Sequence, residues 1–105
     1  MAKTIYHGEI LGSTDVAVQL PSVSYRWGYL KAAIGNTGNV YLGSSSDVTV
    51  SGSSTDTDIT GGFPLDAGDL IVLDFLPLDS HPNLADHWII TDNASDHLSY
   101  YLVDW

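Results

Sequence analysis

Apolar and polar residues alternate with a period of two along much of this 105-residue chain. The alternation is clearest at 16–20, 30–34 and 98–102, where every second residue is Val, Leu, Ile, Ala or Tyr. Successive side chains of a strand point to opposite faces, so this period is typical of strands that bury one face. Apolar residues are continuous at 70–73 and 88–90, which predicts two strands that are covered on one face by the partner sheet and on the other by loops or a neighbouring subunit.

Short strands of this kind account for almost all of the predicted structure. Turn residues separate them, and only 83–86 is predicted to form a single helical turn. A chain of 105 residues has room for one domain with a modest core. We therefore expect an all-β, single-domain antiparallel β-sandwich of jelly-roll type. The predicted strands are 4–10, 15–20, 24–34, 39–43, 47–51, 69–75, 87–91 and 98–104.

The two ends of the chain are expected to make contacts outside the sandwich. Residues 1–12 are predicted to form an N-terminal arm or strand beside a sandwich domain at 13–105. The arm alternates poorly, so it would make a weak strand by itself. Termini fray unless something ties them down, and an exposed terminal Trp commonly contacts another subunit. The residues expected to contact neighbouring chains here are Ile5, Tyr6, Ile10 and Trp105.

The chain is strongly acidic, with thirteen Asp and Glu residues against three Lys and Arg residues and a formal net charge of −10. Binding to a nucleic-acid backbone requires clustered Lys and Arg, so nucleic acid is not an expected partner. No apolar run approaches the length of a membrane span, and no signal-peptide pattern is recognised. We expect no membrane partner, and synthesis in a cytosol. An acidic surface resists aggregation and suits an outward-facing shell component.

No residue pattern indicates catalysis or a metal centre. The four His residues lack the spacings of zinc sites, and the absence of Cys excludes thiolate ligands. Asp92, Asn93 and Asp96 could gather oxygen ligands for Ca²⁺, but incidental clustering of Asp in acidic loops is the favoured interpretation. No Gly-x-Ser-x-Gly elbow is present, and no His pair supports a cupin site. We therefore expect neither a cofactor nor enzymatic activity.

Tyr25, Trp27 and Tyr29 form the most prominent aromatic group. Under strict alternation all three lie on one face of the strand predicted at 24–34. Such a row can pack a core, form a subunit interface or stack against sugar rings. Packing against protein is the favoured interpretation. A carbohydrate-binding module for attachment to a host surface is the alternative of another class.

Two turn-and-strand segments resemble sequences of a known kind. The first is Asn-Thr-Gly-x-Val-Tyr-Leu-Gly at 36–43, and the second is Gly-Phe-Pro-Leu-x-x-Gly-Asp at 62–69. An apolar strand, a Trp-Ile-Ile strand and a terminal Leu-Ser-Tyr-Tyr strand follow. Together, over residues 14–104, these features resemble the small β-sandwich virion proteins of tailed bacteriophages.

The resemblance implies a structural protein of the virion. We expect a capsid decoration or cement protein that binds the major capsid protein on the outer head surface, acting as a homotrimer. A head-fibre base or a tail component is the alternative within the virion class. A decoration protein stabilises a shell by bridging its subunits through buried area and strand pairing.

Overall fold

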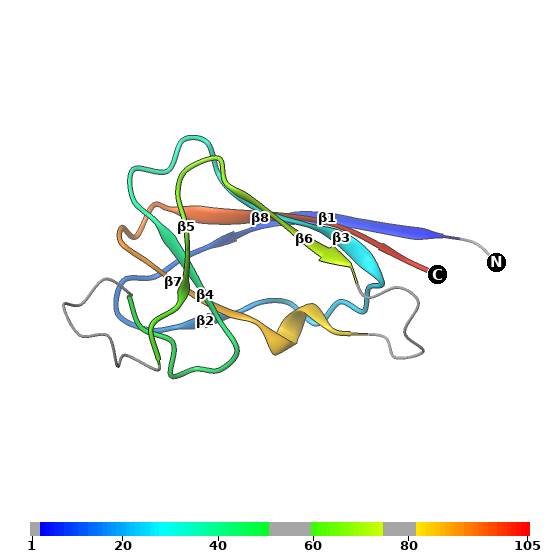
Figure 1. The fold of residues 1–105 in the computed structure, drawn as a ribbon, viewed down its shortest axis with the longest axis horizontal. Coiled ribbons are helices and arrows are strands. Elements are labelled where there is room, and N and C mark those ends of the chain that lie inside the picture. Colours follow the sequence, from blue (N-terminus) through cyan, green and yellow to red (C-terminus); the bar gives the residue numbers. More distant parts are fainter. Residues whose placement is uncertain (1–2, 51–59, 75–81) are drawn as a thin grey trace.

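The computed structural model describes residues 3–50, 60–74 and 82–105. These residues form eight strands in two antiparallel four-stranded sheets, which pack face to face as a sandwich (Figure 1). The predicted all-β sandwich is therefore confirmed.

Sheet A contains the two longest strands of the protein. Its order is β1 (Thr4–Leu11), β8 (His97–Asp104), β3 (Trp27–Ala32) and β6 (Leu70–Asp74). The strands β1 and β8 pair along their whole length, from Thr4 opposite Asp104 to Leu11 opposite His97. The N-terminal segment is therefore a paired edge strand of sheet A, and its predicted contacts with other chains remain a prediction.

Sheet B is built from shorter strands. Its order is β2 (Val18–Gln19), β7 (Trp88–Thr91), β4 (Val40–Gly43) and β5 (Phe63–Leu65). Every connection between consecutive strands crosses from one sheet to the other, except the one between β4 and β5. The resulting strand orders, 1-8-3-6 and 2-7-4-5, are those of a jelly roll.

The core lies between the inner faces of the two sheets. The alternating residues Leu30, Leu98 and Leu102 of sheet A are fully buried there. They belong to one apolar cluster with Val40 and Ile89 of sheet B. Period-two alternation thus becomes an inner apolar face on each sheet, as the sequence predicted.

A second apolar cluster covers the outer face of sheet B. Tyr41 and Ile90 are opposite each other on β4 and β7, and Val48 packs against both. The backbone at Thr49 is hydrogen-bonded to Thr60 and Gly62, which holds the segment around Val48 against the sheet. The continuous apolar run of β7 is therefore buried on both faces, as predicted.

Two other predictions about strands are wrong. At 47–50 the structure has a single bridge, from Thr49 to Gly61, in place of a strand, because Val48 is used to cover sheet B. The segment at 63–65, predicted as a turn, is strand β5. Pro64 has no N–H to donate, and it is tolerated because β5 is an edge strand.

A side-chain clamp joins the turn after β3 to the turn before β8. The Asp96 carboxyl group is buried and accepts hydrogen bonds from the backbone N–H groups of Thr37 and Gly38, at 3.0 and 3.1 Å, and from the Asn93 side chain at 3.2 Å. The Asn36 amide exchanges two further hydrogen bonds with the His97 backbone. We call residues 36–38 and 92–97 the inter-sheet clamp.

A short 3-10 helix, η1 (Leu84–Asp86), precedes β7 and confirms the helical turn predicted at 83–86. The Asn83 side chain caps it by accepting a hydrogen bond from the Ala85 N–H at 2.9 Å. The next residue, His87, lies 3.4 Å from the Tyr25 hydroxyl through its Nε2 atom. Burial lowers the pKa of His87 and raises the pKa of Tyr25 to about 12.

We predict that Asp96→Ala destabilises the fold by about 2–4 kcal/mol, because it removes a buried carboxyl group that accepts three hydrogen bonds. Urea denaturation followed by circular dichroism measures the loss. Asp47→Ala is the matched control, since Asp47 is exposed, and we expect a change within about 0.5 kcal/mol. Equal losses in the two variants would contradict the structural role of the clamp.

We also predict that His87 makes the fold less stable in mild acid. The unfolded chain binds a proton near the ordinary pKa of 6.5, whereas burial lowers the pKa of His87 in the folded chain. The contribution of neutral His87 to stability is therefore complete well above pH 6.5 and is lost progressively as the pH falls through 6.5 toward the lower pKa of the folded chain. In His87→Gln, the free energy of unfolding measured by urea titration should depend less on pH over this range. An equal pH dependence for the two proteins would contradict the prediction.

Candidate docking surface

The outer face of sheet A points away from the core and carries apolar and aromatic side chains in register across all four strands. One row runs His7, Tyr101, Tyr29 and Val72. The outward-facing residues two positions before and after these four on each strand form the neighbouring rows, because the pairing register is fixed. We define the outer face of sheet A by Ile5, His7, Glu9, Trp27, Tyr29, Lys31, Leu70, Val72, Asp74, Ser99, Tyr101 and Val103.

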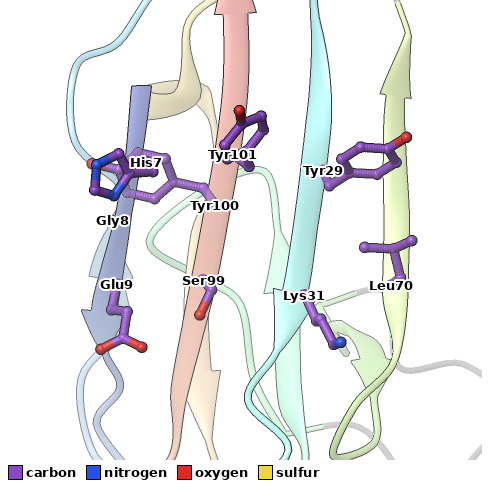
Figure 2. A pocket seen from close by; sticks show the side chains of 9 residues that line it. All are labelled: His7, Gly8, Glu9, Tyr29, Lys31, Leu70, Ser99, Tyr100 and Tyr101. Atoms are coloured by element: carbon purple, nitrogen blue, oxygen red, sulfur yellow. The ribbon is translucent and has the colours of Figure 1, made fainter. Parts of the chain in front are cut away.

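The middle of this face is an open groove of about 860 Å³. Figure 2 shows His7, Tyr101 and Tyr29 on three neighbouring strands, with Leu70 on β6 at the far side. The apolar residues here are exposed to an unusual degree: Val72 is 54% and Tyr101 is 48% accessible. In the described chain only the inner side of β6 meets the core, so cover of its outer side by a neighbouring subunit stays a prediction.

A smaller apolar hollow continues the face toward the chain ends. Trp27 lies edge-to-face against Tyr29, with ring centroids 4.8 Å apart. Trp27 also lines a hollow of about 360 Å³ together with Ile5 and Trp105. The Lys3 ammonium group lies 5.8 Å from the centroid of the Trp105 ring, within the range of a cation–π contact.

Charge is distributed unevenly around the molecule. Lys31 lies on the outer face of sheet A, Lys3 lies at its margin, and Arg26 is 5.9 Å from the Trp105 ring centroid. These are all three of the Lys and Arg residues in a chain with thirteen acidic residues. Only Glu9 and Asp74 bring carboxyl groups to the paired positions of this face. The face is therefore close to neutral on a protein whose net charge is −10.

The two sheets differ in how the chain itself covers them. Val48 shields the outer face of sheet B, as described above. Over residues 3–50, 60–74 and 82–105, no buried cluster forms on the outer side of sheet A. A contiguous apolar patch of this kind commonly marks an interaction site.

The aromatic row predicted from sequence is divided by the structure. Trp27 and Tyr29 lie on the outer face of sheet A, but Tyr25 is fully buried in the core. The strict alternation fails because β3 begins at Trp27 and the chain bends at Arg26. Placing Tyr25 on the same face as Trp27 was therefore wrong.

The other predicted contact residues lie on both sides of β1 and at the C-terminus. Ile5 and Trp105 border the outer face of sheet A, while Ile10 packs on the core and Tyr6 is partly exposed on the inner side. Sequence reasoning missed Leu70, Val72 and Tyr101. Their signal was present, since a strand with apolar residues on both faces must find cover for each of them.

Acidic and imidazole groups do not converge on this face in a metal-binding arrangement. In the described parts of the chain, no group of three or more His, Asp or Glu residues is placed to hold an ion. The Asp92 and Asp96 carboxyl groups, considered above as Ca²⁺ ligands, accept hydrogen bonds from the turn at 37–39. Within the same described ranges, no helix is both long and apolar enough to cross a membrane.

Comparison with known proteins returned no family model, no curated protein and no solved structure that matches this chain.

Two neighbouring residues of β8 provide a test of which face is buried. We predict that Leu102→Ala, at a site with 0% exposure, costs about 2–5 kcal/mol. Tyr101→Ala, on the opposite face of the same strand, should cost less than about 1 kcal/mol. Urea unfolding of both variants checks the difference. A large loss for Tyr101→Ala would show that this face is covered in the free protein.

Proposed function

We propose that this protein is a non-catalytic structural protein that docks onto a larger protein assembly through the outer face of sheet A. The observation that carries the proposal is the near-neutral apolar face, in register across four strands, on an otherwise acidic molecule. Interface cores are enriched in aromatic residues, which this face carries on its two central strands. Trp27, Tyr29 and Tyr101 are the expected anchors.

A flat sheet face suits a protein partner better than a small substrate. Small-molecule sites are concave and bury most of the ligand, whereas this groove is open along the sheet. A row of ordered side chains on a rigid sheet binds with little loss of conformational entropy. The aromatic side chains therefore provide area and shape, and no reacting group is required.

The assembly that we propose is the shell of a tailed bacteriophage. The turn and strand sequences at 36–43 and 62–69 support it through their resemblance to virion proteins. In this role the protein decorates the outer capsid surface, with the outer face of sheet A against the major capsid protein and the acidic loops toward solvent. A head-fibre base or tail component would use the same face on another part of the virion.

We predict that Val72→Glu abolishes binding to capsid shells assembled without the protein. The substitution places a carboxyl group on the β6 side of the apolar face, opposite Tyr29 in the register. Burying an unpaired charge in an interface commonly lowers affinity at least tenfold. Co-sedimentation with purified shells measures the occupancy.

The matched control is Val16→Glu, since Val16 is 68% exposed and lies in the connection between β1 and β2. It makes the same chemical change outside sheet A and should leave shell binding unchanged. Equal binding by Val72→Glu and the native protein would contradict docking through this face. Binding of the native protein to a glycan array, lost in Tyr101→Ala, would favour the carbohydrate-binding alternative.

A further inference from the structure

The edge of β1 is the most open strand edge in the described protein. Each sheet has two edge strands, and the other three are short: β2 has two residues, β5 has three and contains Pro64, and β6 has five. The strand β1 has eight residues and no Pro. Native proteins usually shorten, bend or cover such an edge, because its unpaired backbone groups can accept another strand.

The backbone groups that β1 offers can be identified from the ladder. The Gly12 N–H donates to the Asp96 carbonyl at 2.9 Å, which continues the β1–β8 register by one pair. Backbone groups alternate in direction along a strand, so the even-numbered residues of β1 are hydrogen-bonded to β8. Lys3, Ile5, His7 and Glu9 therefore direct their N–H and C=O groups away from the sheet.

The charged residues at the β1 edge of one copy are complementary to those of a second copy. Lys3 and Glu9 are equally far from Tyr6, on opposite sides of it in the sequence. In an antiparallel pair of two β1 strands centred on Tyr6, each Lys3 is opposite the Glu9 of the other copy, and each Ile5 is opposite a His7. Opposite charges directly across a strand pair stabilise it, and like charges destabilise it.

Other registers lose this match. Centring the pair on His7 places Glu9 opposite Ile5 and the two imidazole rings opposite each other. Centring it on Ile5 places Lys3 opposite His7. Of these three registers, the Tyr6-centred one alone places both charges opposite each other, and it uses Lys3, Ile5, His7 and Glu9 in hydrogen-bonded positions.

We propose that two copies of this chain associate through antiparallel pairing of their β1 strands, centred on Tyr6, into a continuous eight-stranded sheet. Lys3 and Glu9 balance each other at this edge, so two chains of net charge −10 can meet there without like charges opposite each other across the strand pair. The pairing is isologous, so it closes as a dimer and does not produce the trimer that the resemblance implies. The outer face of sheet A stays free, so pairing and shell binding can fail independently.

The first test measures the mass of the protein in solution and asks whether this mass depends on the His7 backbone N–H group. Sedimentation equilibrium of the native protein should give twice the 11.3 kDa of one chain. His7→Pro removes an outward N–H and leaves the β1–β8 ladder intact, so it should give a folded monomer. His7→Ala keeps the N–H and should stay dimeric. A native monomer or trimer, or a His7→Pro dimer of unchanged affinity, would overturn the proposal.

The second test exploits the absence of Cys from the chain. In the proposed register the two Tyr6 residues form a non-hydrogen-bonded pair, whose Cα atoms lie about 4.5 Å apart, within reach of a disulfide. Tyr6→Cys should therefore form a covalent dimer under mild oxidation. Thr4→Cys lies four residues out of register with its symmetry mate and should not. Efficient crosslinking through Thr4→Cys, or none through Tyr6→Cys, would overturn this register.

The third test asks whether Lys3 and Glu9 act by pairing their charges across the two copies or have only a structural role. Lys3→Glu places like charges opposite each other at two positions and should raise the dimer dissociation constant about tenfold or more. Glu9→Lys should do the same. The double variant Lys3→Glu/Glu9→Lys restores opposite charges and should recover dimerisation. Additive losses in the double variant would overturn the proposed pairing.

Discussion

The buried carboxyl group of Asp96 holds together the end of the sandwich where the chain passes between its sheets. It fixes the turn at 36–38, which leads from β3 to β4, against the turn that leads from β7 to β8. The strands β3 and β8 are the two central strands of sheet A. The ladder between them places Tyr29 opposite Tyr101 on the proposed docking face, and the clamp ties the end of that ladder to sheet B.

The two sheets use the same alternating pattern with different results. Sheet B hides its outer apolar residues under the chain's own segment around Val48. Sheet A has longer strands, and in the described residues its outer apolar positions are left for solvent or for a partner. Exposed apolar area of this size costs free energy in the isolated chain, which an interface recovers. The uneven covering is therefore the structural reason for assigning docking to sheet A.

The sequence predicted the fold well because period-two alternation is a local property. Strands such as 98–104 and the helical turn before β7 follow from neighbouring residues alone. The contact of Val48 with sheet B and the inward position of Tyr25 depend on chain segments far apart in sequence, so local patterns could not show them. The proposed docking face was anticipated only in part, since Trp27 and Tyr29 were noticed as aromatic residues while Tyr101 was not singled out.

One proposed docking face is small for a stable interface, and pairing through β1 would enlarge it. Four strands about 4.8 Å apart, each contributing some six residues at about 3.3 Å per residue, offer a footprint on the order of 400 Å². A stable interface between two proteins buries about 800 Å² on each partner. Joining two copies along β1 sets two outer faces side by side in one rigid sheet, which doubles the footprint and makes the second contact intramolecular. Weak docking by a single copy would then become firm attachment of a pair, with the carboxyl groups of the acidic loops outside the contact.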